Sequence, residues 1–264
     1  MPKNGQSRVL TPAQREHLFS VIKQHRHPEK NTAIMQISFK LGLRVQEIAL
    51  LELKEVCRLN KRNKALPRSF DLHQVMSLPV AYTKGADALG RSKTKYERRT
   101  ISFSVNEFKR VVSQIEALAK AGAEIDPETF YPPVKRHKGK SRDLPLVDED
   151  LRQALSDYLV IRLERDPGAQ PSDPLFITQK GGPYSPNTLQ EHMAMMLREW
   201  AGIEKASSHS GRRTLITDVI HGQKKSVKVA QKIAGHVSPS TTIIYEEPPE
   251  EELADALKNV TRQP

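Results

Sequence analysis

The most informative segment of this chain is AGHVSPSTTIIY, residues 234–245. It places His236 nine residues before Tyr245, with small turn-forming residues and then β-branched residues between them. Such a segment predicts a tight turn followed by a short packed stretch that ends at the tyrosine. A lone histidine or tyrosine in this setting usually serves packing, so the pair acquires chemical meaning only from motifs elsewhere in the chain.

Two motifs precede it. GLRVQEI, residues 42–48, supplies Arg44, and HSGRRT, residues 209–214, supplies His209 and Arg212. His209 and Arg212 are one helical turn apart, so both can face the same point. Taken alone, Arg44 is equally well a surface residue at a helix start, and His209 a capping or loop residue. The order and spacing of all three motifs favour a shared site.

The amino-acid composition indicates which kind of partner the protein binds. Lys and Arg number 42 and Asp and Glu 31 among 264 residues, which gives a net charge of +11. An excess of this size favours a polyanionic partner, most commonly nucleic acid. The single cysteine, Cys57, excludes an internal disulfide framework and a multi-cysteine zinc site. No carboxylate or thiol lies at ligand spacing beside His209, His221 or His236, so no metal is expected.

No segment is long and apolar enough to span a bilayer, and the first ten residues lack the apolar middle of a secretory signal. We therefore expect a cytoplasmic protein without a membrane partner. Thr11, Pro12 and Gln14 predict a capped helix start. Further helices are expected from about Asn31 to Gly42, over 45–51, over 105–122 and, with few interruptions, from 147 onwards. Segments 75–82 and 99–104 and a short stretch near 144 are expected strands. The predicted fold is mainly α with a small antiparallel β-sheet.

Together the three motifs resemble those of the tyrosine recombinase family, the phage-integrase type. Its members carry, in order, G-L-R-x-x-E-I/L, a hairpin lysine, H-x-L-R-H/R-T and L-G-H-x-x-x-x-T-T-x-x-Y. The resemblance runs from about Thr11 to the C-terminus, with Gly211 and Ala234 standing where the family usually has leucine. It implies the tyrosine recombinase catalytic-domain fold, the DNA breaking-rejoining enzyme type.

The resemblance also implies roles for the motif residues. Arg44 and Arg212 would hold the non-bridging oxygens of a DNA phosphodiester, because guanidinium groups bind phosphate with paired, charge-assisted hydrogen bonds. Tyr245 would attack phosphorus and form a 3′-phosphotyrosyl link. His209 would assist proton transfer and His236 would donate a hydrogen bond to the phosphate. Since the bond energy is kept in the link, neither a cofactor nor a metal is needed.

The family's lysine, the acid for the leaving 5′-oxygen, has two candidates. Pairing of a strand at 99–104 with the strand at 75–82 favours Lys93, and the two prolines in FYPPVK weaken a second hairpin. The spacing to DLPL at 143–146 favours Lys138 as the alternative. Either choice requires an insertion of roughly forty residues relative to the family.

We expect a basic tail at 1–10, a catalytic domain at 11–245 with an insertion within 84–140, and an acidic helical tail at 246–264. Because the catalytic-domain helix is expected to begin near Thr11, we expect no room for the family's usual core-binding domain ahead of it. Segments 84–99 and 135–143 each carry +4, and the tail after Tyr245 carries −4. The two basic segments therefore supply candidate DNA contacts: Lys84, Arg91, Lys95, Arg98, Lys140 and Arg142.

The resemblance implies double-stranded DNA as partner, a homotetramer assembled on it, accessory recombination factors, and a prokaryotic, phage or plasmid origin with the protein at the nucleoid. The expected activity is site-specific cutting and rejoining, in integration and excision or in inversion. Two alternatives remain open at this point: a catalytically silent DNA-binding accessory protein, and a type IB topoisomerase. The complete set of motif residues argues against the first, and His209 ahead of Arg212 argues against the second.

Overall fold

A computed structural model describes residues 7–60, 68–79, 105–125, 141–236 and 238–245, together with Phe130 and Lys258. The chain divides into two compact units, Gly85–Lys138 and the remainder, Met1–Lys84 with Gly139–Pro264. The expected strand at 99–104, both candidate lysines and all but one residue of the acidic tail lie outside the described residues.

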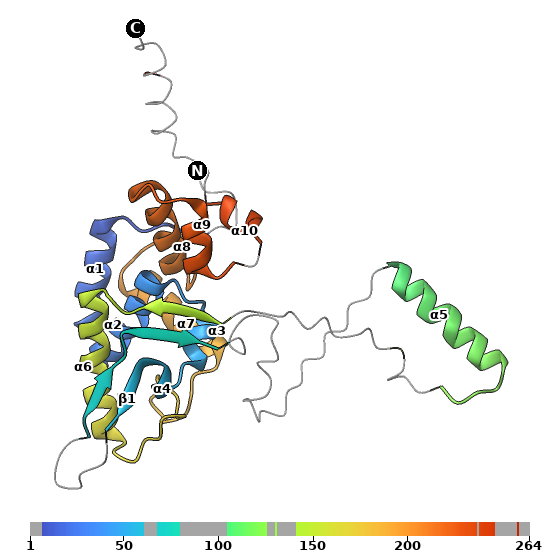
Figure 1. Ribbon diagram of the computed structural model, residues 1–264, viewed down its shortest axis with the longest axis horizontal. Coiled ribbons are helices and arrows are strands. Elements are labelled where there is room, and N and C mark those ends of the chain that lie inside the picture. Colours follow the sequence, from blue (N-terminus) through green and yellow to red (C-terminus); the bar gives the residue numbers. More distant parts are fainter. Residues whose placement is uncertain are drawn as a thin grey trace. The chain divides into compact units, whose positions relative to one another are not determined.

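The larger unit is built mainly from short helices (Figure 1). In chain order they are α1 (Pro12–Ile22), α2 (Pro28–Gln36), η1 (Ile37–Leu41), α3 (Val45–Leu50), α4 (Leu53–Val56), α6 (Glu149–Arg165), α7 (Pro186–Met195), η5 (Met196–Trp200), α8 (Ser210–Thr217), η6 (Asp218–Gly222), α9 (Val227–Ala234) and α10 (Ser240–Ile243). The segments η1, η5 and η6 are π-helical continuations of the helix before them. The mainly helical class predicted from the sequence is confirmed.

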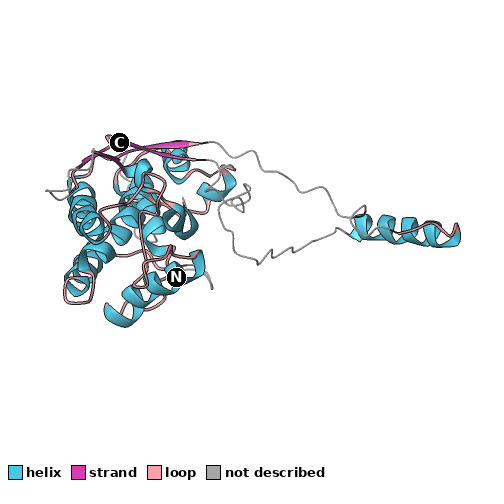
Figure 2. Ribbon diagram, turned by 90° about the horizontal axis from the view of Figure 1, so that it is seen from below, coloured by secondary structure: helices cyan, strands magenta, loops and turns pink. Residues whose placement is uncertain are grey.

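The strands form two antiparallel pairs rather than one sheet. β1 (Cys57–Leu59) pairs with β2 (Phe70–Leu72), and β3 (Val75–Leu78) pairs with β4 (Arg142–Pro145). They run along one side of the helical body (Figure 2). The register of the second pair sets Leu78 opposite Arg142. Among the described residues, β3 therefore pairs with a segment that follows Lys138 in the chain.

The N-terminal helix starts as its sequence predicts. The Thr11 hydroxyl accepts from the Gln14 amide at 3.2 Å, and the Gln14 side chain accepts from the Thr11 amide at 3.1 Å. This reciprocal pair satisfies two of the amide groups that a helix start leaves without a partner. Further along, η1 ends at Gly42, whose φ of 61° is a left-handed conformation that glycine adopts without steric penalty. The reversal at Gly42 places Arg44 at the start of α3.

The core has two parts. The main cluster gathers apolar side chains from α1 to α7, including Leu18, Ile34, Leu51 and Leu155. A smaller cluster lies within α8, η6 and α9: Ile216, Val219, Ile220, Ala230 and Ala234, with Tyr245 packed against it. The candidate nucleophile and both candidate histidines thus belong to the C-terminal part of the unit, whereas Arg44 belongs to the main cluster's helices.

In the unit Gly85–Lys138 the described helix is α5 (Val105–Lys120), and none of its side chains is buried. Among the described residues of the whole chain, none of the helices combines the length and apolar character needed to traverse a lipid bilayer.

The two parts of the larger unit meet where α8 packs against η1. A β-carbon added at Gly211 would lie 3.0 Å from Ser38 Cβ and 3.1 Å from the Ser38 carbonyl carbon. Both distances are tighter than ordinary packing allows, and neither atom can move without shifting η1. This close approach leaves no room for a side chain at position 211 in the described structure.

We predict that Gly211→Ala lowers the free energy of unfolding by about 1–3 kcal/mol, the usual effect of overpacking, as measured by urea denaturation. Gly182→Ala is the matched control, because a β-carbon there meets nothing within 4 Å. Equal stability of the two variants would show that η1 and α8 are not held in close contact.

Candidate active site

The site begins with a buried carboxylate. Glu47, 1% exposed, lies one turn into α3 and its Oε2 accepts from the Arg44 backbone amide at 2.7 Å. Its Oε1 accepts from Arg44 Nη1 at 3.1 Å. Glu47 therefore caps the helix and orients the Arg44 side chain at once. Arg44 itself is about a quarter exposed, at 27% of its side-chain area, so its guanidinium can still meet a ligand.

Arg212 joins the two parts of the larger unit. It is 4% exposed, and its guanidinium donates to the carbonyl of Gly42 and, at 2.6 Å, to the carbonyl of Ala234. The first carbonyl is two residues before Arg44 and the second is two residues before His236. Burial, followed by repulsion from Arg44, lowers the pKa of Arg212 to about 9, so it remains charged at neutral pH.

Arg142 lies in the same network, which corrects its expected place in an exposed basic loop. It is 9% exposed, and its Nη2 donates to Glu47 Oε2 at 2.9 Å. Its Nη1 donates to the Ile233 carbonyl at 2.9 Å. Burial lowers its pKa, and the neighbouring Glu47 charge works in the opposite direction. The sequence assigned Arg142 to DNA binding because it ends a run of basic residues, a local pattern that does not reveal burial.

His236 and Tyr245 face one another. Their ring centroids are 6.1 Å apart and the ring planes are inclined by 20°. His236 Nδ1 lies 2.8 Å from Thr242 Oγ1, and the backbone of Tyr245 is tied to His221 Nε2 at 3.0 Å. The Arg213 guanidinium lies over the Tyr245 ring, 5.8 Å from its centroid. Tyr245 is half-buried, so its position is defined by these contacts on several sides.

Burial, followed by the charges of three neighbouring arginines, lowers the pKa of His236 to about 4. At neutral pH the imidazole is uncharged and offers one N–H and one lone pair. In the tautomer in which Nδ1 accepts from the Thr242 hydroxyl, Nε2 carries the hydrogen and can donate it to another acceptor. A neutral donor suits a site that already holds several positive charges.

His209 precedes α8 and is exposed, with its Nδ1 3.3 Å from Ser208 Oγ. It sits one turn before Arg212, as the sequence predicts. The predicted residues Arg44, Arg212, His236 and Tyr245 are linked by the contacts above. Lys93, Lys138, Lys84, Arg91, Lys95, Arg98 and Lys140 lie outside the described residues.

The electrostatic character of the site follows from its members. Arg44, Arg142 and Arg212 bring three positive charges around a single carboxylate, Glu47. The excess positive charge is complementary to an anion with several acceptor oxygens, such as a phosphodiester. Within the described residues no cluster of His, Cys, Asp and Glu could hold a metal ion.

Two contributors were not predicted from the sequence: Arg142 as a site residue and Thr242 as the partner of His236. The sequence features that could have revealed them are the R-x-x-P-L spacing that starts at Arg142 and the position of Thr242 six residues after His236.

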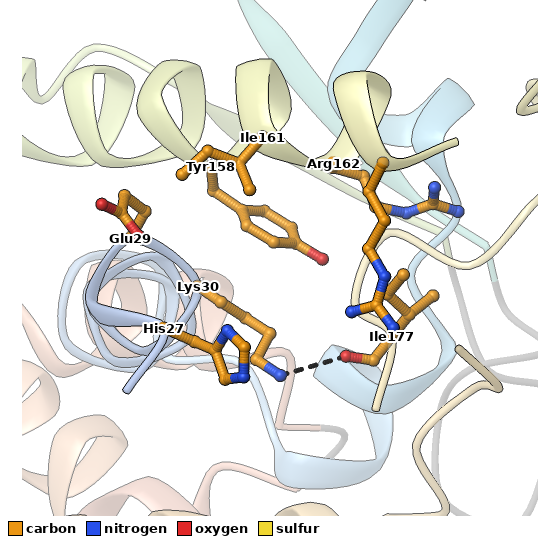
Figure 3. Close-up of a pocket in the computed structure, with 8 residues that line it drawn as sticks. His27, Glu29, Lys30, Tyr158, Ile161, Arg162 and Ile177 are labelled. Carbon is orange, nitrogen blue, oxygen red and sulfur yellow. Dashed lines mark hydrogen bonds between the residues drawn. The ribbon is translucent and has the colours of Figure 1, made fainter. Parts of the chain in front are cut away.

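A basic cavity between α2 and α6 is separate from the candidate active site (Figure 3). There Lys30 donates to the Ile177 carbonyl at 3.2 Å, and burial lowers the pKa of Lys30 to about 8. None of the motif residues lines that cavity.

Known proteins resemble this chain in sequence and in fold. Residues 123–252 match the model of the phage integrase family. The tyrosine recombinase XerD of Corynebacterium glutamicum is 33% identical over 146 residues, 53% of this chain and 45% of the relative. The tyrosine recombinase XerC of Methylobacterium nodulans is 30% identical over 106 residues, 40% of this chain and 31% of the relative. The chain thus spans less than half the length of these two relatives.

Solved structures share the fold at low sequence identity. The XerA recombinase superimposes with a TM-score of 0.57 at 17% identity, covering 100% of this chain and 66% of that one. The XerH site-specific recombinase bound to a palindromic difH substrate gives 0.57 at 16%, covering 98% and 55%. The Tn1549 transposon integrase in complex with transposon right end DNA gives 0.54 at 16%, covering 97% and 67%. The expected catalytic-domain fold is confirmed.

We predict that the His236 ring titrates near pH 4 instead of near 6.5, because proton uptake would place a further charge beside three arginines. Proton NMR of the histidine C2 signals across pH 3.5–8 measures this, with His236→Gln assigning the resonance. Since the folded pKa is depressed, the unfolded chain takes up the proton first. Stability contributed by neutral His236 should therefore decline as pH falls from about 6.5 towards 4. A midpoint above pH 6 would contradict the buried, arginine-flanked position.

Proposed function

Since this chain belongs to the phage integrase family of tyrosine recombinases, we propose that it is a site-specific DNA recombinase. It would cleave and rejoin DNA strands through a 3′-phosphotyrosyl intermediate, in integration and excision or in inversion. Double-stranded DNA is the proposed partner, with a homotetramer assembled on it. The relatives and the solved structures are recombinases and integrases, some of them bound to DNA.

One observation carries the proposal: a continuous set of contacts joins four of the residues that the reaction needs, Arg44, Arg212, His236 and Tyr245. Glu47 orients Arg44, and Arg212 bonds the carbonyls beside Arg44 and beside His236. His236 in turn stacks on Tyr245. Residues from distant parts of the sequence are thereby brought together in one positively charged site. Phosphoryl transfer needs such a site, because the reacting groups must be positioned and the negative charge of the transition state must be stabilised.

The proposed reaction follows from the chemistry of these groups. The Tyr245 oxygen attacks phosphorus while its proton passes to His209, and the bond from phosphorus to the 5′-oxygen breaks. Arg44 and Arg212 neutralise the charge that grows on the non-bridging oxygens, and neutral His236 donates a hydrogen bond to one of them. The leaving 5′-oxygen takes a proton from the lysine. Attack by a 5′-hydroxyl on the phosphotyrosine reverses these steps and rejoins a strand.

The observed strand pairing bears on the choice of lysine. The argument for Lys93 rests on pairing of 75–82 with 99–104, which lies outside the described residues; among the described residues β3 pairs with β4, which begins at Arg142, four residues after Lys138. We therefore propose Lys138 as the general acid and leave Lys93 as a candidate phosphate contact.

The proposed activity is tested with nicked duplexes. DNA bound by the protein is first selected from a randomised pool and then nicked near candidate cleavage points, so that the short 5′-hydroxyl strand diffuses away and traps the adduct. Without added metal, the protein should form a covalent adduct that survives denaturant. Tyr245→Phe should reduce adduct formation below detection while retaining DNA affinity, because only the attacking oxygen is lost. An adduct that persists in Tyr245→Phe would overturn the assignment of the nucleophile.

The lysine is tested with the same duplexes. Lys138→Ala should slow adduct formation by about 10²–10⁴-fold, the usual contribution of a positioned acid. Replacing the bridging 5′-oxygen with sulfur should restore its rate, because a thiolate leaves without a proton. Lys93→Ala is the matched control and should stay within a few fold of the wild type on both substrates. Rescue by sulfur in Lys93→Ala, and not in Lys138→Ala, would reverse the assignment.

A further inference from the structure

Arg142 occupies an unusual place for a residue next to a basic segment. It lies at the start of β4, opposite Leu78, and is 9% exposed. Its guanidinium reaches the C-terminal end of α9, where a β-carbon added at Gly235 would lie 2.7 Å from Nη1. Gly235 has a φ of 62°, so the absence of a side chain there serves both the backbone and the approach of Arg142.

The two hydrogen bonds of Arg142 reach two different parts of the site. Nη2 donates at 2.9 Å to Glu47 Oε2, the same oxygen that accepts from the Arg44 amide. Nη1 donates at 2.9 Å to the Ile233 carbonyl, three residues before His236. One side chain therefore connects the carboxylate that orients Arg44 to the helix end that leads into His236.

Loss of the Arg142 side chain would affect both Glu47 and the C-terminal end of α9. Glu47 is 1% exposed, and without Arg142 its Oε2 loses a charged donor and keeps the Arg44 backbone amide. The Ile233 carbonyl would lose a bond at a helix C-terminus, where carbonyl groups already lack intrahelical donors. Arg44 and the segment carrying His236 could then shift independently of one another.

From these contacts we infer that Arg142 is a positioning residue for the cleavage reaction. It fixes the separation between Arg44 and His236 by holding Glu47 and the end of α9 together. This inference rests on the proposed function and adds to it a residue outside the three motifs. A displacement of about 1 Å at a reacting group can slow a reaction about 10²-fold, so the effect should appear in rate more than in DNA affinity.

The experiment compares Arg142→Met with Arg152→Met. Arg152 also donates to two backbone carbonyls, those of His73 at 3.0 Å and Leu146 at 3.1 Å. It therefore reports the general effect of losing such an arginine. For each variant we would measure the melting temperature, the Kd for the selected duplex, and the single-turnover rate of adduct formation on its nicked form, per folded molecule.

We expect Arg142→Met to slow adduct formation about 100-fold with a Kd within threefold of the wild type. Arg152→Met should lower the melting temperature and leave the rate unchanged. Arg142→Lys, which can pair with Glu47 but cannot bond the Ile233 carbonyl at the same time, should recover about tenfold. In a Glu47→Gln background, Arg142→Met should slow the reaction by less than threefold more, because Glu47 and Arg142 belong to one link between Arg44 and the end of α9, which either substitution interrupts.

The inference fails if Arg142→Met changes only the melting temperature, which would make Arg142 a residue of the fold alone. It also fails if Kd weakens in parallel with the rate, which would make Arg142 a direct phosphate contact, or if the effects of Glu47→Gln and Arg142→Met multiply. Should Arg142→Met not fold, Arg142→Lys carries the test, with a rate about tenfold below wild type at unchanged Kd. Absence of an adduct with the wild-type protein would instead refute the proposed function.

Discussion

One buried guanidinium holds the two parts of the larger unit together at the site. Arg212 donates to a carbonyl of the Gly42 turn and to a carbonyl at the end of α9. Because the two apolar clusters are separate, side-chain burial alone would not fix how the turn and the helix end lie. Arg212 and the neighbouring Arg142 connect them with directional bonds. The relative position of Arg44, His236 and Tyr245 depends on these bonds.

The same arrangement has an electrostatic cost. Three arginines surround one carboxylate, and their repulsion contributes to the lowered pKa of Arg212 and of His236. Bonds to backbone carbonyls and to Glu47 offset part of this cost in the folded chain. A bound phosphodiester would remove more of it by supplying negative charge where the arginines converge. A site in which positive groups repel one another therefore favours a ligand whose negative charge increases during the reaction.

Local features of the chain were largely predictable. The capping box at Thr11, the end of a helix at Gly42 and the motif around Tyr245 depend on residues close in sequence, and the structure follows them. Features that depend on distant partners were not. The pairing of β3 with β4 and the burial of Arg142 arise from contacts between residues far apart in the chain, which periodicity and composition do not encode. Thr242 was missed as the partner of His236 because a threonine in a turn has many ordinary roles.

The β3–β4 pair has a consequence for how such a chain can change over evolutionary time. Its two strands meet across roughly 60 intervening residues, yet closing so long a loop costs only about 2 kcal/mol more than closing a tight turn, because the entropy grows with the logarithm of length. The segment between the two strands can therefore lengthen or shorten at little energetic cost, while the strand register that sets Arg142 beside Glu47 is kept.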